Sequence, residues 1–315
     1  MATIKLGSNF NVNDPSSYNV GEVVSQTATP TGFTITDSLG NSATVVGTGM
    51  TYDADGDWIS GIANSITLRM GGQLVLEATG LSVDGRSTAF DTGYGGEAPG
   101  MQAELAYWLR DSDTIIGGAG NESLKGFGGN DSIQGGAGAD TIDGGAGVDT
   151  AVYAGNAASY QVTRSTTSTN SFRVTGGTDG GDTLINVERI KFADATVALD
   201  VAGTAGQAYR LYQAAFNRTP DVAGLGWQIK AMDAGTSLLQ VSQNFMDSTE
   251  FKSLYGSNPS QSTLVNLLYQ NVLHRTPQQF EVDFWVGILN GTNPSSHQTP
   301  AEVLMNFSES AENQA

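Results

Sequence analysis

A nine-residue repeat between residues 117 and 152 constrains the fold of this chain more than any other feature. Four units follow one another, GGAGNESLK, GFGGNDSIQ, GGAGADTID and GGAGVDTAV. Glycine fills most of the first, second and fourth positions, where it permits backbone conformations with positive φ. An acidic residue stands sixth and an apolar residue eighth in every unit. A short fixed period of this kind predicts a solenoid, in which each turn packs on its neighbours.

The apolar eighth positions are expected to point inward from short strands and to form a thin core. They are Leu124, Ile133, Ile142 and Ala151. If two units make one turn, loops 18 residues apart stack, so Asp131 lies over Asp149 and Glu122 over Asp140. Two carboxylates with several backbone carbonyls make an all-oxygen cage, which suits Ca²⁺ better than zinc or copper. A flexible glycine-rich linker is the alternative, but it would not need this regular spacing.

These units resemble the RTX (repeats-in-toxin) calcium-binding family, whose pattern is G-G-x-G-x-D-x-U-x. The resemblance implies ions held between two stacked loops. One loop would contribute the carbonyls of its first and third residues and its acid, and the next loop those of its second and fourth residues and its acid. One site would use Gly126, Gly128, Asp131, Gly145, Gly147 and Asp149. The opposite site would use Gly117, Ala119, Glu122, Gly136, Gly138 and Asp140.

Two residues depart from the family pattern, and one acid outside the repeat is a further candidate ligand. Glu122 replaces aspartate and is one methylene longer, which predicts a weaker site. Phe127 replaces a glycine, which predicts local backbone strain. Asp113 lies 18 residues before Asp131 and could join a third site, although its loop lacks the glycines.

Charge and composition limit which binding partners and which cellular location the protein can have. Fourteen Lys and Arg against 32 Asp and Glu give a net charge of −18, which disfavours nucleic acid as a partner. The chain has no cysteine, so disulfides and thiolate metal sites are excluded. No apolar run approaches the ~20 residues that span a bilayer, and no N-terminal signal peptide is visible. The RTX resemblance implies type I secretion through a C-terminal signal, a secreted, extracellular or cell-surface location, and closure of the roll by external Ca²⁺.

The pattern along the chain predicts a multi-domain protein. We expect an all-β domain over 1–110, a parallel β-roll over 111–152, a β cap over 153–203 and an all-α domain over 204–315. Alternating residues at 66–70 indicate a half-buried strand, and helical spacing indicates a short helix near 101–109. Arg218-Thr219-Pro220 returns as Arg275-Thr276-Pro277, so the helical domain is predicted to contain two related units. It resembles a domain of unknown function found beside RTX repeats.

Other candidate sites have simpler interpretations. The segment Asp53–Asp57 is interpreted as a hairpin turn rather than a calcium loop, because it lacks a distal bidentate acid. His274 takes the place that Asn217 has in the first helical unit, which indicates a helix end rather than a catalytic base. Trp227 and Trp285 are interpreted as core residues in preference to ligand-stacking residues.

Three function classes follow, in order of preference. The first is a non-enzymatic structural protein that forms a surface layer, filament or matrix, with a homo-oligomer or polymer as its working state. The second is an adhesin or carbohydrate-binding protein that uses the N-terminal β domain, with a surface polysaccharide as partner. The third is a hydrolase with an unrecognised site, which is disfavoured because the zinc-protease and lipase motifs are missing. We therefore predict that the protein is not an enzyme.

Overall fold

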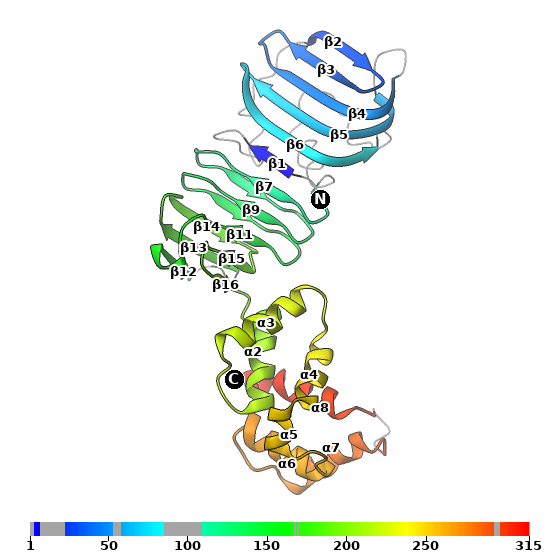
Figure 1. Ribbon diagram of the computed structural model, residues 1–315, viewed down its shortest axis with the longest axis vertical. Helices are drawn as coiled ribbons and strands as arrows, with labels where there is room; N and C mark the ends of the chain where they lie inside the picture. Colours follow the sequence, from blue (N-terminus) through cyan, green and yellow to red (C-terminus); the bar gives the residue numbers. More distant parts are fainter. Residues whose placement is uncertain are drawn as a thin grey trace. The chain divides into compact units, whose positions relative to one another are not determined.

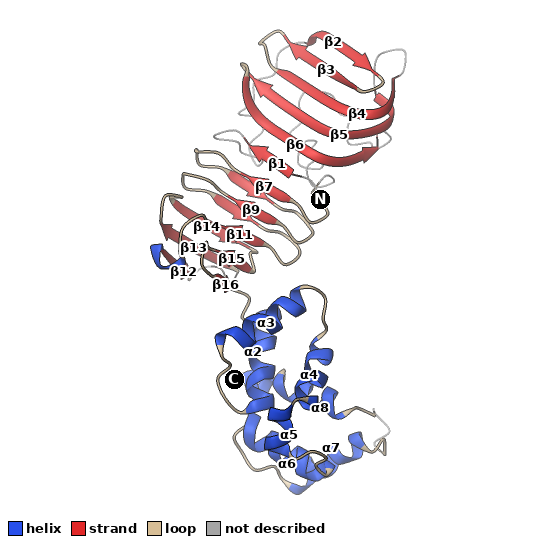
Figure 2. Ribbon diagram, viewed as in Figure 1, coloured by secondary structure: helices blue, strands red, loops and turns tan. Residues whose placement is uncertain are grey.

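A computed structural model describes residues 3–6, 23–52, 58–84, 109–292 without Thr167 and Thr169, and 297–314. Backbone contacts divide the chain into two compact units, Met1–Leu199 and Asp200–Ala315. The first unit is built mainly of strands and the second of helices (Figures 1 and 2). In the described part of the chain, every helix is too short or too polar to cross a membrane. The chain is thus multi-domain, with β structure preceding α structure as the sequence predicts.

The N-terminal part of the first unit is an antiparallel sheet of long strands. Its strands are β2 (Val23–Thr29), β3 (Gly32–Asp37), β4 (Ser42–Tyr52), β5 (Trp58–Met70) and β6 (Gln73–Asp84). Each strand pairs with the next along the chain. Val45, Ile66 and Leu76 are buried on one face, because side chains two residues apart share a face of a strand.

Strand β1 (Thr3–Leu6) joins this sheet to the repeat. It pairs antiparallel with β6 on one side and parallel with β7 (Thr114–Ile116) on the other. Figure 1 shows β1 lying between these two strands. Among the described residues a single sheet therefore runs in the order β16-β15-β11-β9-β7-β1-β6-β5-β4-β3-β2. Main-chain pairing thus crosses residue 110, where the sequence predicted a domain boundary.

The repeat forms short parallel strands in two sheets. One sheet carries β7, β9 (Ser132–Gln134) and β11 (Thr150–Val152), and the other carries β8 (Ser123–Lys125) and β10 (Thr141–Asp143). The register joins residues 18 apart, as in Thr114↔Ser132 and Ser132↔Thr150. The predicted stacking of alternate units is therefore confirmed. The eighth-position residues form the core between the sheets, each at most 1% exposed: Leu124, Ile133, Ile142 and Ala151.

The segment after the repeat adds one more turn before it closes the roll. Strands β14 (Gly181–Ile185) and β15 (Arg189–Lys191) pair parallel with β10 and β11. Antiparallel strands cover the outer edges of this turn. The short helix η2 (Ala157–Ser159) leads into β12 (Tyr160–Arg164) and β13 (Ser171–Gly176), and β13 pairs with β14. On the other sheet, β16 (Thr196–Ala198) pairs with β15. Pairing the last repeat strands in this way covers edges that would otherwise be open.

The second unit contains two related helical arrays. The first has α2 (Thr204–Phe216), α3 (Val222–Asp233), α4 (Leu238–Asp247) and α5 (Thr249–Tyr255). The second has α6 (Gln261–Val272), α7 (Gln279–Leu289), α8 (Pro300–Ser308) and α9 (Ala311–Gln314). Asn217 and His274 both take left-handed φ values, 48° and 52°, just after α2 and α6. The prediction that His274 is a helix-end residue is confirmed.

The two tryptophans have different environments, and for one of them the sequence prediction was wrong. Trp285 is half-buried and packs against Phe307, with ring centroids 5.1 Å apart. Trp227 is 63% exposed and is not a core residue. The expected turn over Asp53–Asp57 and the expected helix over 101–108 lie outside the described residues.

Candidate calcium site

A column of carboxylates runs along one side of the roll, at the loops that precede β7, β9, β11 and β15. The backbone N–H of Asp113 donates to Asp131 Oδ1 at 2.7 Å, and the N–H of Asp131 donates to Asp149 Oδ1 at 2.8 Å. The N–H of Asp149 donates to Glu188 Oε2 at 2.8 Å. Asp131 therefore lies over Asp149 as predicted, and Asp113 extends the column upward.

A second column stands in the loops that precede β8 and β10 and at the start of β14. The N–H of Glu122 donates to Asp140 Oδ1 at 2.8 Å, and that of Asp140 donates to Asp182 Oδ1 at 2.9 Å. The Tyr153 hydroxyl donates to Asp182 Oδ2 at 2.9 Å. Glu122 folds its longer side chain back onto its own loop, where it accepts from the N–H groups of Gly118 and Gly120.

These carboxylates are buried and incompletely satisfied. Asp131, Asp140 and Asp149 are at most 2% exposed, and in the described part of the chain the Oδ2 atom of each has no hydrogen-bond partner. The pKa of Asp131 is raised to about 7, chiefly by burial and also by the charges of Asp149 and Asp113, while the hydrogen bond from the Asp113 N–H opposes the rise. Burial likewise raises the pKa values of Asp140 and Asp149 to about 6. Buried acids with free oxygens call for a cation.

Glycine lets the loops approach closely enough to share that cation. Gly138 has φ +129°, and a Cβ there would lie 1.7 Å from the Gly120 carbonyl oxygen. Gly147 has φ +145°, and its Cβ would lie 1.8 Å from the Gly129 carbonyl oxygen. Phe127 adopts φ 67° at a position where its neighbours in the repeat have glycine. Phe127 therefore has the strained backbone conformation that the sequence predicts.

Backbone carbonyls face the gaps between stacked loops. Beside Asp131 and Asp149, the Phe127 carbonyl accepts from Ala146 N–H, and the Ala146 carbonyl accepts from Gly129 N–H. One predicted ligand is placed differently: the Gly138 carbonyl accepts from Gly181 N–H and faces the loop of Asp182, not that of Glu122. The reason is that the roll gains a further turn at Asp182. The other predicted carbonyl ligands stay predictions: Gly117, Ala119, Gly126, Gly128, Gly136, Gly145 and Gly147.

Sequence reasoning missed Asp182 and Glu188. Both stand two residues before an inward apolar residue, Leu184 and Ile190, as every acid of the repeat does. The acid-x-apolar spacing was therefore a usable signal. It was hidden because the glycines that make the repeat conspicuous are partly replaced between Gly177 and Glu188.

The residues present fit a hard cation bound by oxygen. The described residues hold no cluster of three or more His, Cys, Asp or Glu side chains, so each ion would need main-chain carbonyls beside a stacked carboxylate pair. Ca²⁺ accepts mixed carboxylate and carbonyl ligands in flexible geometry. Asp131 with Asp149, and Asp140 with its neighbours in the second column, are the pairs that would hold it. A bound ion would neutralise carboxylates that otherwise repel each other.

Comparison with known proteins agrees with this geometry. A family model described as the RTX calcium-binding nonapeptide repeat (4 copies) matches residues 110–126 and 116–151. This chain carries RTX calcium-binding repeats. A second model, a domain of unknown function (DUF4214), matches residues 242–315, which include the whole second helical array. RTX repeats bind Ca²⁺ and belong to proteins generally exported by type I secretion, so the chain is a secreted calcium-binding protein.

Other comparisons add little to the RTX repeats. The crystal structure of the extracellular lipase LipA from Serratia marcescens is similar at 22% identity and a TM-score of 0.24. The similarity covers 27% of this chain and only 14% of the lipase. No curated protein matched the chain.

Substitutions in the two columns are expected to affect different ions. Asp131→Asn and Asp149→Asn should lower the affinity for the same ion, and Asp140→Asn should lower the affinity for an ion on the opposite side. Each loss should be on the order of 10–100-fold. Isothermal titration calorimetry of the full chain checks this through affinity and stoichiometry. Asp143→Asn is the matched control, because Asp143 belongs to the same repeat but bonds Asn186 instead of joining a column. Equal effects of all four changes would contradict the assignment.

Two glycine substitutions test whether glycine is needed only where stacked loops approach closely. Gly138→Ala should destabilise the calcium-loaded roll by on the order of 3 kcal/mol. The added Cβ would clash with the Gly120 carbonyl oxygen, and alanine rarely adopts the φ of this position. Gly128→Ala should be near neutral, because the nearest atom to its Cβ is 3.7 Å away. Thermal unfolding in saturating Ca²⁺ compares the two variants, and similar melting temperatures would refute the expectation.

Proposed function

We propose that this protein is a non-enzymatic structural component of the cell surface or extracellular matrix, and that Ca²⁺ lets its copies associate. The observation that carries the proposal is the position of β1 between β6 and β7. Strand β7 belongs to the calcium-dependent roll, and it supplies one of the two edges on which β1 pairs. Calcium would therefore order the join between the roll and the antiparallel sheet as well as the roll itself.

The far end of the same sheet supports self-association. Strand β2 is its last strand among the described residues, and its sequence VVSQTAT contains no charged residue and no proline. Charges and prolines are the usual devices that prevent edge strands from pairing with other chains. An edge without them can pair with a second copy of this protein.

Charge explains why association would wait for export. At −18 the copies repel one another, and each bound ion cancels two of those charges. External salt then screens the remainder over ~8 Å.

Sedimentation velocity across a calcium titration tests the proposal with the full chain. We expect monomers without Ca²⁺ and larger species at millimolar Ca²⁺, increasing with protein concentration. The double variant Gln26→Lys and Ala28→Lys should reduce assembly, because it places two charges on the β2 edge. The control, Ser257→Lys with Asn258→Lys, adds the same charge at exposed sites of the helical unit. A monomer at every calcium and protein concentration rules assembly out.

A further inference from the structure

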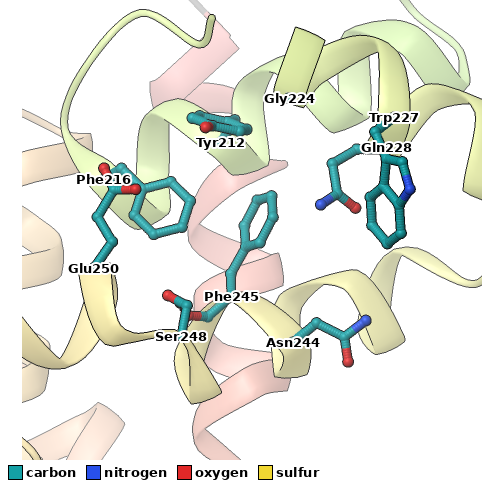
Figure 3. A pocket seen from close by; sticks show the side chains of 9 residues that line it. All are labelled: Tyr212, Phe216, Gly224, Trp227, Gln228, Asn244, Phe245, Ser248 and Glu250. Atoms are coloured by element: carbon teal, nitrogen blue, oxygen red, sulfur yellow. Dashed lines mark hydrogen bonds between the residues drawn. The ribbon is translucent and has the colours of Figure 1, made fainter.

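The first helical array contains a pocket of about 320 Å³. Tyr212 and Phe216 of α2 and Phe245 of α4 form its aromatic wall (Figure 3). The rings of Tyr212 and Phe245 are 5.3 Å apart and nearly perpendicular. Trp227 and Gln228 of α3 line the pocket from the other side. Its volume lies at the lower end of the range typical of small-ligand sites, about 300–1,000 Å³.

The internal repeat explains why a pocket exists here. A shift of 57 residues relates Tyr212 to Tyr269 and Gln228 to Trp285. In the second array the Trp285 indole occupies the corresponding space: its Nε1 lies 3.3 Å from the Tyr269 hydroxyl, and it packs on Phe307. In the first array the smaller glutamine stands at that position. The pocket is therefore the space that a tryptophan fills in the other half of the same domain.

Gln228 leaves an unmet hydrogen-bonding group in this space. The residue is 9% exposed, and among the described residues its Oε1 has no hydrogen-bond partner. In Figure 3 its amide lies between Trp227 and Phe245. A buried acceptor without a partner is costly, so a ligand that donates an O–H or N–H here gains affinity by satisfying it.

The rest of the lining defines what kind of ligand fits. Trp227 is 63% exposed and offers a flat apolar surface at the rim. Asn244 is held by Gln240, whose side chain donates to its Oδ1 at 2.9 Å. Glu250 is the charged residue of the lining, and Arg218 pairs with it at 2.7 Å. An anionic ligand would meet no lining cation, and a wholly apolar one would leave Gln228 unsatisfied.

We propose that this pocket binds a neutral sugar unit of a polysaccharide. The C–H face of the sugar ring would stack on Trp227, and a ring hydroxyl would donate to Gln228 Oε1. A sugar combines a flat apolar face with several O–H donors, which is the combination that the lining calls for. This role goes beyond calcium-dependent assembly and does not depend on it, because the pocket lies wholly within the helical unit.

The test uses the full chain in Ca²⁺ on an array of neutral microbial and plant glycans, with calorimetry on the oligosaccharides that bind. Trp227→Ala removes the stacking surface and should lower affinity at least about tenfold. Gln228→Trp copies the second array and should abolish binding by filling the pocket. Phe284→Ala is the matched control, because Phe284 is the 57-residue counterpart of Trp227 and is also exposed. Its affinity should equal that of the wild type.

Circular dichroism at 222 nm establishes that each variant keeps its helices. The proposal is supported if both pocket variants bind the glycan less tightly and the control binds it as the wild type does. The proposal is overturned if no neutral glycan binds, or if Gln228→Trp binds as the wild type does. Assembly measured by sedimentation is a separate readout, so failure of one proposal does not disguise failure of the other.

Discussion

Removal of calcium is expected to unfold the roll completely and to leave the helical unit folded. Asp131, Asp140 and Asp149 are buried beside other acids, and the short strands between them bury only one inward side chain each. Without a cation, so thin a core cannot offset the repulsion and desolvation of ionised carboxylates. Hydrogen exchange of the full chain, with and without chelator at pH 8, should show the amides of β8–β11 losing all protection.

The helical unit serves as the internal control. Its core is continuous and apolar, and it needs no metal to pack. The residues of this core include Leu211, Phe216, Val241, Phe245, Leu268 and Phe307. Its exchange pattern and its signal at 222 nm should not change with chelator. Protection of the repeat strands that persists without calcium would contradict the expectation for the roll, and loss of helical signal would contradict that for the helical unit.

The roll was predictable because each of its requirements is local and repeated. Glycine at fixed positions, an acid before each strand and an apolar residue inside each strand leave one arrangement, in which units 18 residues apart stack. That stacking predicted the contacts of Asp131 with Asp149 and of Glu122 with Asp140, and the hydrogen bonds confirm both. The two helical units were visible for the same reason, since Arg218-Thr219-Pro220 and its copy share a spacing.

The features that escaped prediction depend on contacts distant in sequence. Strand β1 pairs with residues 70 or more positions away, and four residues of ordinary strand sequence do not indicate their partner. Asp182 joins its column from 42 residues beyond Asp140, after an intervening hairpin. The sequence prediction paired Trp227 with Trp285, but Trp227 lies one residue before the true counterpart, Gln228, and so faces a different side of its helix. Burial of that kind is a tertiary property.

Acid is expected to replace calcium partly in folding the roll. In the folded state burial raises the pKa of Asp131 to about 7 and those of Asp140 and Asp149 to about 6, whereas an unfolded aspartate has a pKa near ~3.9. Between roughly pH 4 and pH 7 the folded, metal-free roll therefore binds more protons than the unfolded chain. By linkage, its free energy of unfolding rises as the pH falls through that window.

Calcium reverses the sign of this dependence. The ion binds ionised carboxylates, so protons compete with it, and the calcium-loaded roll should lose stability as the pH falls from 8 to 5. Between pH 8 and pH 5, the folded fraction of the metal-free roll, measured by hydrogen exchange, should therefore rise, whereas the melting temperature of the roll in saturating Ca²⁺ should fall. A metal-free roll that is as unstable at pH 5 as at pH 8 would contradict the expectation.

The triple variant Asp131→Asn, Asp140→Asn, Asp149→Asn isolates the cause. An amide has nearly the shape of a protonated carboxyl group and carries no charge, so this variant should fold its roll without calcium at neutral pH. It should also lose most of the pH dependence, because the groups that titrate are gone. If the repulsion of these three acids is what keeps the metal-free roll open, neutralising them by mutation or by protonation must close it in the same way. A variant that stays unfolded while acid folds the wild type would place the titrating groups elsewhere, for example at Asp182, whose pKa burial also raises.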